Sequence, residues 1–295
     1  MTQPVLTPAL ELGPVQLRVS NLERSLRFYE DIVGLRVTGR EGGTVQLSAA
    51  AGPVLLQLRE LPEGMEKPKR GVSGLYHFAI LLPDRAGLGL VLRNLLESGV
   101  SVGQGDHLVS EALYIQDPDD NGIELYRDRP RDTWRRDAQG HYVMTTDAVD
   151  GEALLAAAEG STWEGLPSGT TIGHVHFHVG NLQQAAEYYT GILGFELTAL
   201  YGGAATFLSA GGYHHHIGLN VWAGEGAPAA SPMAPGIDYF TIVLPEQAQV
   251  EEVLGRIRQA GYDVGEADGA PMVKDRWGIG ARFTVREMPD AGSGQ

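Results

Sequence analysis

Residues 13–35, GPVQLRVSNLERSLRFYEDIVGL, recur 160 positions later as residues 173–195, GHVHFHVGNLQQAAEYYTGILGF. Eight of the 23 aligned positions are identical without a gap. A second pair, residues 74–83 (GLYHFAILLP) and 236–245 (GIDYFTIVLP), agrees at five of ten positions. The chain therefore contains two copies of one unit, and each unit has two parts.

Each repeated segment has the pattern of a β-strand followed by a helix. Residues 15–19 alternate apolar and polar side chains, which is typical of a half-buried strand. The residues from Leu22 to Ile32 place apolar side chains on one face, which predicts an amphipathic helix. The expected capping residues are equivalent in the two copies: Asn21 and Asn181 before the helix, Gly34 and Gly194 after it.

The remaining apolar runs complete four βαβββ modules, two in each half of the chain. Short apolar runs bounded by turn residues predict the further strands. The modules are expected at about residues 13–60, 73–129, 172–223 and 236–287. The first two form a domain over 13–129 and the last two a domain over 172–287. A connector over 130–171, with a short helix at Glu152–Ala158, joins the two domains.

The composition excludes several classes of function. The 295 residues carry a formal net charge of −15, so binding to nucleic acid or to anionic lipid is not expected. No apolar stretch is long enough to span a membrane, and residues 1–13 lack a secretory leader pattern, so we expect a cytoplasmic protein. Because the chain has no cysteine, any metal must be held by histidine and carboxylate side chains.

Four segments carry a resemblance to a known family. They are LYHFAILLPDR (75–85), DHLVSEALYIQDPDDNGIELYRDRPR (106–131), YVMTTDAVD (142–150) and GGYHHHIGLNVWAG (211–224). Together with the four modules, they resemble the vicinal oxygen chelate superfamily, which includes glyoxalase I, bleomycin resistance proteins and extradiol dioxygenases. Within it, the sequence is most similar to the bacterial two-domain catechol 2,3-dioxygenases. The resemblance implies an α+β fold in which the four modules form two cupped mixed β-sheets with helices outside.

In this family the metal ligands come from the first strands of paired modules and from a last strand. The matching residues in this chain are Pro14, His77, His174 and Tyr239 on first strands, and Glu124 and Arg282 on last strands. The usual pairing, of the first module with the second and the third with the fourth, leaves each cup short of ligands. Pairing modules two and three instead brings together His77, Glu124 and His174, the ligand set of non-heme Fe(II) oxygenases. We therefore expect these modules to hold Fe(II), Mn(II) or another divalent metal, and the other two modules to form a metal-free cup.

The resemblance also implies three catalytic residues: His215, Tyr114 and His107. His215 is the best match, within the run 214–216, to a histidine near the metal, and a neutral imidazole can accept a proton from a catechol near neutral pH. Which histidine of that run acts stays open. Tyr114 would bond the substrate oxygen, and His107 would line the pocket. Gly218 matches the position of a fourth ligand in glyoxalase I, where a small residue would leave coordination sites open.

The expected function is extradiol ring cleavage, the Fe(II)-dependent oxidation of a catechol by O₂ to a ring-opened hydroxy-semialdehyde in aromatic hydrocarbon catabolism. Its partners would be a small aromatic diol and O₂, and we expect a homo-oligomer. Two alternatives stay open: a glyoxalase-like metal-dependent isomerase or transferase, and a non-catalytic small-molecule binding protein of the bleomycin-resistance kind. The first would need a fourth carboxylate, which Gly218 does not supply. The second would need no ligand triad.

Overall fold

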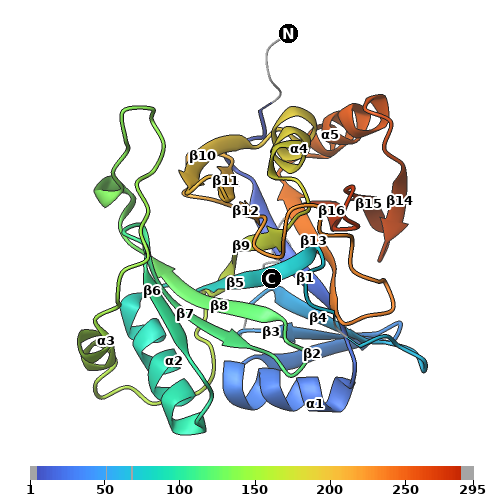
Figure 1. Ribbon diagram of the computed structural model, residues 1–295. Helices are drawn as coiled ribbons and strands as arrows, with labels where there is room; N and C mark the ends of the chain where they lie inside the picture. Colours follow the sequence, from blue (N-terminus) through green and yellow to red (C-terminus); the bar gives the residue numbers. More distant parts are fainter. Residues whose placement is uncertain (1–4, 51, 68, 287–295) are drawn as a thin grey trace, which may run out of the picture.

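The computed structural model describes residues 5–50, 52–67 and 69–286, and all its named strands belong to one 16-stranded mixed sheet with helices on its outer faces (Figure 1). The predicted α+β class is confirmed. The expected two separate sheets are instead continuous, because β1 and β9 pair at Leu12 and Ile172. The last predicted residue of module four, 287, lies outside the described residues. No described helix has the length and apolar character needed to cross a membrane.

Two halves of this sheet each curve into a cup. The first cup contains the strands of modules two and three, in spatial order β10 (Glu196–Tyr201), β11 (Ala205–Ser209), β12 (Ile217–Asn220), β9 (Thr171–His178), β5 (Gly74–Leu81), β8 (Gly122–Asp128), β7 (Ser110–Gln116) and β6 (Gly103–Asp106). The second cup contains those of modules one and four, in order β2 (Arg36–Glu41), β3 (Thr44–Ser48), β4 (Val54–Glu60), β1 (Glu11–Val19), β13 (Gly236–Leu244), β16 (Gly280–Val285), β15 (Ala270–Lys274) and β14 (Val264–Ala267).

The strand pairing at the centre of each cup is antiparallel. In the first cup β5 pairs with β9, so that Ala79 lies opposite His174. In the second cup β1 pairs with β13, and Gln16 lies opposite Tyr239. Gln16 is the repeat equivalent of His176, which lies opposite His77 in the first cup, so the two central pairings have the same register. The central partners therefore come from modules two and three in the first cup and from modules one and four in the second, so each cup combines one module from each half of the chain.

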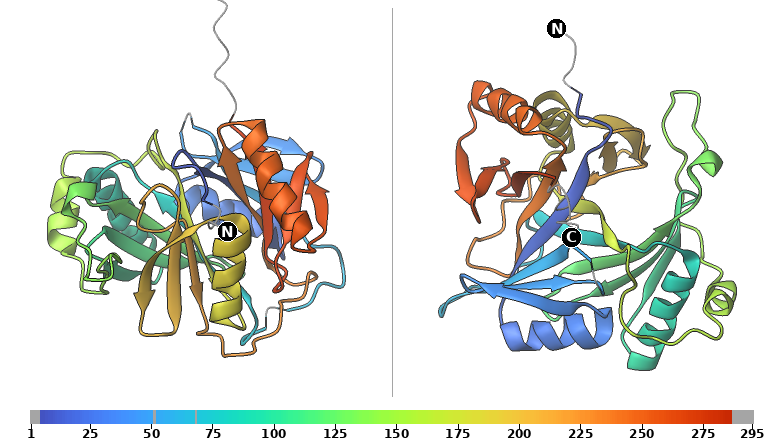
Figure 2. Two further views of the ribbon diagram at one scale, coloured as in Figure 1. Left: turned by 90° about the horizontal axis from the view of Figure 1, so that it is seen from above. Right: turned by 180° about the vertical axis from the view of Figure 1, so that it is seen from behind.

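Contacts between helices join module one to module two and module three to module four. Their bounds are α1 (Leu22–Arg27), η1 (Phe28–Val33), α2 (Arg85–Ser98), η2 (Arg131–Thr133), α3 (Gly151–Ala157), α4 (Leu182–Glu187), η3 (Tyr188–Leu193) and α5 (Gln247–Gln259). Asn94 on α2 donates to the carbonyl of Ile32 at 2.8 Å, and Arg256 on α5 donates to that of Ile192 at 3.0 Å. Figures 1 and 2 show α1 beside α2 at one end of the molecule and α4 beside α5 at the other. Strands and helices thus link the four modules into one body.

The helix predicted over 22–32 changes its geometry partway along. It is α-helical to Arg27 and then a π-helix, η1, and the second copy does the same with η3. The predicted caps are confirmed: Asn21 and Asn181 each accept a backbone N–H, and Gly34 and Gly194 have positive φ. A π-turn inserts one residue into a helical turn, which changes the direction of the side chains that follow.

Each π-helix carries a tyrosine that is bonded to the turn of the neighbouring module. Tyr29 donates to Asp117 at 2.9 Å, and Tyr189 donates to Asp275 at 3.3 Å, all four side chains being buried. Asp117 also accepts the backbone N–H groups of Asp119 and Asn121 at 2.8 and 2.9 Å, as expected of a turn. This turn leads directly into β8, the strand that carries Glu124, and so fixes where that strand begins.

Candidate metal centre

Three neighbouring strands bring His77, Glu124 and His174 together. His77 lies on β5, Glu124 on β8 and His174 on β9, and β5 pairs with both other strands. On β9 the fully buried Val175 faces the helices, and the alternation of a strand turns His174 to the opposite face. One ligand atom from each of the three residues lies within 4.8 Å of the others, and no other group in the described part of the chain meets that criterion.

The donor set fits a divalent metal. The Nε2 atoms of His77 and His174 both lie 3.1 Å from Oε2 of Glu124, and all three side chains are buried. The contact of His77 Nε2 with Glu124 lacks the geometry of a hydrogen bond, so this nitrogen has no hydrogen-bond partner among the described residues, although a buried imidazole nitrogen normally has one. A cation bound among the three atoms would satisfy it. Two imidazole nitrogens and one carboxylate oxygen suit Fe(II), Mn(II) and similar ions.

The charges at the cluster agree with this reading. Burial alone would raise the pKa of Glu124, but the imidazoles of His174 and His77 outweigh it and hold that pKa well below its usual range. Burial lowers the pKa of His77. The cluster therefore combines an ionised carboxylate with an imidazole that burial keeps unprotonated, which is the protonation state in which these groups bind metals.

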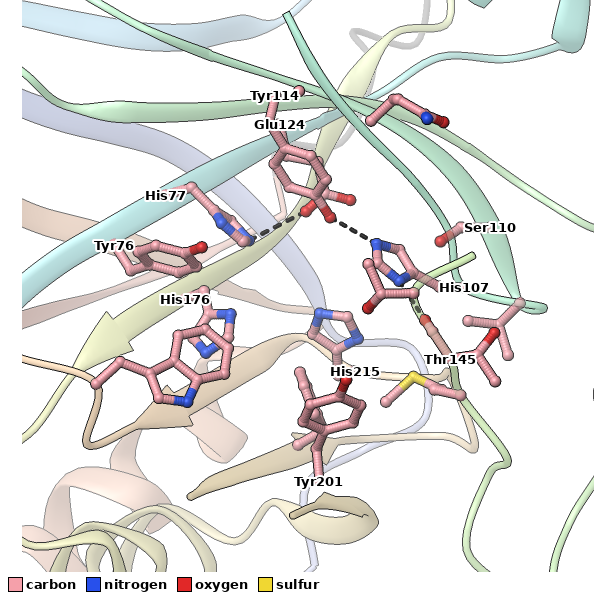
Figure 3. A pocket seen from close by; sticks show the side chains of 17 residues that line it. Tyr76, His77, His107, Ser110, Tyr114, Glu124, Thr145, His176, Tyr201 and His215 are labelled. Atoms are coloured by element: carbon pink, nitrogen blue, oxygen red, sulfur yellow. Dashed lines mark hydrogen bonds and ion pairs between the residues drawn. The ribbon is translucent and has the colours of Figure 1, made fainter. Parts of the chain in front are cut away.

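A cavity of about 380 Å³ opens beside the cluster (Figure 3). His77 and Glu124 form part of its wall, and the ring of Tyr76 lies next to His77. The aromatic residues Phe207 and Trp222 also line it. A mainly apolar cavity with a few convergent polar groups is typical of a small-molecule site.

Tyr114 and His107 also line this cavity and are bonded to each other. Tyr114 lies opposite Glu124 in the β7–β8 pairing, and its hydroxyl is 2.6 Å from Nε2 of His107. Nδ1 of His107 is 2.6 Å from the carbonyl of Thr145, which can only accept, so the proton of a neutral His107 is on Nδ1. Tyr114 therefore donates to Nε2. Burial, reinforced by Glu124, raises the pKa of Tyr114 well above 10.0, so the hydroxyl stays protonated.

The structure distinguishes the three consecutive histidines. His215 lines the cavity, and its ring centroid is 4.1 Å from that of His174. Figure 3 shows it facing the same space as His77 and His107. Burial lowers the pKa of His215 well below 6.5. His214 is fully buried behind it, and His216 accepts the backbone N–H of Ala210 at 3.2 Å.

The space above Gly218 is occupied by the ring of His176. A Cβ at position 218 would lie 2.7 Å from Cγ and 2.9 Å from Nδ1 of that ring. Asn220 holds the ring by donating to its Nε2 at 3.0 Å, and the backbone N–H of Trp222 fixes the orientation of the Asn220 amide. The small residue at 218 therefore accommodates a neighbouring imidazole, which the sequence comparison had not indicated.

The equivalent positions in the second cup hold a different set of side chains. Tyr239 is bonded to Asp268, accepts from Gln16 at 3.1 Å and lies 2.8 Å from Oε1 of Gln57. Arg282, opposite Thr241 on β13, donates to the carbonyl of Asp268 at 2.9 Å. These groups satisfy one another by hydrogen bonds. Of the six residues considered as ligands from sequence, the fold therefore gathers His77, Glu124 and His174, and separates Pro14, Tyr239 and Arg282 from them.

Two residues of the centre were not singled out from sequence. His176 shares a strand face with His174, and the spacing of two was a signal for it. Asp128 follows Glu124 and Tyr126 at the same spacing on β8, and its Oδ1 lies 2.8 Å from Nε2 of His214. The spacing of two from Tyr126 was a signal for the strand face of Asp128, but its partner His214 comes from a different module, which local patterns cannot reveal.

The chain matches a known family over most of its length. Residues 11–125 and 171–284 match the glyoxalase/bleomycin resistance protein/dioxygenase superfamily. A catechol-2,3-dioxygenase of Bacillus subtilis (strain 168) is 51% identical over 265 residues, which cover 90% of this chain and 93% of that protein.

Solved structures show the same fold at low sequence identity. A putative dioxygenase from Bacillus subtilis superposes with a TM-score of 0.61 at 13% identity, covering 96% of this chain and 86% of that one. Glyoxalase I from Zea mays gives 0.55 at 14% identity, covering 93% and 92%. The resemblance inferred from sequence is confirmed: the chain is an enzyme of the dioxygenase type and belongs to the glyoxalase/bleomycin resistance protein/dioxygenase superfamily.

Proposed function

We propose that the chain is an extradiol ring-cleavage dioxygenase that uses Fe(II), held by His77, Glu124 and His174, to oxidise a catechol with O₂ to a ring-opened hydroxy-semialdehyde. The observation that carries the proposal is the convergence of these three side chains beside a cavity of about 380 Å³, whose wall includes His77 and Glu124. The 51% identity to a catechol-2,3-dioxygenase supports the same reaction class.

The cavity supports a small aromatic substrate. A metal held by the three ligands would bring the diol and O₂ together and pass electrons between them. The volume of about 380 Å³ lies within the range of small-molecule sites, about 300–1,000 Å³, and is ample for a catechol. Tyr76, Phe207 and Trp222 offer edges and faces against which such a ring can pack.

The polar residues of the wall suit the proton transfers that catechol binding requires. A catechol must lose its protons to bind as a chelate, and His215, neutral because it is buried, can accept one of them. The Tyr114 hydroxyl stays protonated and donates a hydrogen bond to His107. The lone pairs of its oxygen can therefore accept a hydrogen bond from the substrate. We assign His215 the role of base, and Tyr114 and His107 the role of orienting the diol.

The test is a screen of catechols with protein loaded with Fe(II) under anaerobic conditions and then exposed to air. Ring-opened semialdehydes are yellow, so product is followed by absorbance, and bound iron is measured on the same preparation. His174→Ala should lose both iron and turnover. The matched control Tyr239→Phe, in the second cup, should keep both. The proposal would be wrong if iron-loaded wild-type protein opened no catechol, or if Tyr239→Phe lost the iron that His174→Ala retained.

A further inference from the structure

His215 is the first member of a row of hydrogen-bonded side chains that leads away from the cavity. Its Nδ1 lies 2.7 Å from Nδ1 of His214, and Nε2 of His214 lies 2.8 Å from Oδ1 of Asp128. His214 is fully buried, whereas the side chain of Asp128 is 23% exposed. The row therefore runs from the wall of the cavity, through a buried imidazole, to a carboxylate near the surface.

The carboxylate determines where the protons of the two imidazoles lie. An ionised Asp128 can only accept, so the Nε2–H of His214 must donate to it. A neutral imidazole has one N–H, so Nδ1 of His214 is then unprotonated and can only accept. The contact between the two histidines can then be a hydrogen bond only if the Nδ1–H of His215 donates to Nδ1 of His214. Neutral His215 is left with an unprotonated Nε2, the ring nitrogen that remains for the cavity.

Aromatic residues hold His214 in this orientation. Its ring packs against that of Tyr213 at a tilt of 35°, with centroids 4.1 Å apart, and lies edge-on to Trp134 at 5.1 Å. The hydroxyl of Tyr213 also donates to Oδ1 of Asp128, at 3.2 Å. Because His214 is enclosed on several sides, it cannot turn its ring without displacing these neighbours.

We propose that Asp128 and His214 are positioning residues, which set the tautomer of His215 so that an unprotonated Nε2 faces the cavity. The inference rests on the proposed function, in which His215 accepts a proton from the diol. If the tautomer were reversed, His215 would present an N–H to the substrate and could not act as its base. The same arrangement, a carboxylate that fixes the tautomer of a catalytic imidazole, is general in acid–base catalysis.

The direct test is ¹⁵N NMR of the histidine rings, which distinguishes the Nδ1–H from the Nε2–H tautomer and requires neither metal nor turnover. The full chain is labelled on histidine and treated with a chelator, and the signal of His215 is assigned from His215→Gln. The wild-type protein should show His215 with its proton on Nδ1. The matched control Tyr213→Phe keeps the ring and the carboxylate, and should leave that signal unchanged. His214→Phe and Asp128→Leu, which remove the acceptors, should shift His215 toward the Nε2–H form.

Kinetics provide a second readout. In His214→Phe the turnover number should fall about 10- to 100-fold, the range typical of losing a hydrogen-bonding partner that orients a metal-ligating imidazole, while KM and metal content stay close to wild type. A wild-type His215 protonated on Nε2 would overturn the inference, even if the variants failed to fold. So would a His214→Phe protein with the wild-type tautomer and turnover. If the wild-type protein opened no catechol, the proposed function would fail, but the tautomer measurement would still decide the inference.

Discussion

Gly218→Ala tests the packing of His176 against the floor of the cavity. The new methyl group would lie 2.7 Å from Cγ, 2.9 Å from Cδ2 and 2.9 Å from Nδ1 of the imidazole. Favourable carbon contacts are at about 3.5–4.0 Å, so the ring must move by roughly 1 Å. Overpacking of this kind costs about 1–3 kcal/mol. If the movement breaks the 3.0 Å bond from Asn220, about 1 kcal/mol is added. The free energy of unfolding should therefore fall by about 2–4 kcal/mol.

The assay is urea denaturation of a double-mutant cycle with His176→Ala, which removes the ring. In that background Gly218→Ala should cost less than about 0.5 kcal/mol, so the two changes should be coupled by at least about 1.5 kcal/mol. Gly265→Ala is the matched control, because it is another strand glycine and the nearest atom to its Cβ is 4.0 Å away. Equal losses from Gly218→Ala with and without the ring of His176 would refute the reasoning.

Three further outcomes are expected. His215→Gln should cut turnover about 10²–10⁴-fold while bound metal stays at the wild-type level, and full activity across about pH 6–9 would place the base elsewhere. Removing the metal with a chelator should lower the melting temperature of the wild-type protein but not that of His174→Ala. A ligand present at 100 times its Kd adds about 2.7 kcal/mol to the free energy of unfolding. Tyr29→Phe removes a buried hydrogen bond to Asp117, so the free energy of unfolding, measured by urea denaturation, should fall by about 1–3 kcal/mol while metal content stays unchanged. A loss below about 0.3 kcal/mol would contradict this reasoning.

Features that depend on local sequence could be predicted well. The repeat revealed the modules, and Asn21 and Gly34 lie at the ends of the first helix because capping depends only on nearby backbone groups. The alternation of strands put His174 on the cavity side and Val175 on the helix side, since that depends only on the backbone of β9.

The pairing of modules two and three followed from the family resemblance and the ligand set, but individual hydrogen bonds between modules could not be predicted. The change to a π-helix at Phe28 accompanies the bond from Tyr29 to a turn 88 residues away. Asp128 belongs to the centre because it meets His214, 86 residues later in the chain. A short segment of sequence cannot reveal either partner, because residues this far apart in the chain meet only when whole modules pair.

The two cups show that the fold alone does not make a metal site. Both have the same strand order and register, so His77 corresponds to Tyr239 and Glu124 to Arg282. In the first cup the buried Nε2 of His77 lacks a hydrogen-bond partner among the described residues, and a cation can satisfy it. In the second cup the hydroxyl of Tyr239 is already bonded to Asp268, and the permanent charge of Arg282 repels a cation. Replacing Arg282 by a carboxylate would therefore be insufficient for metal binding there, because Asp268 and its partners would still fill the site.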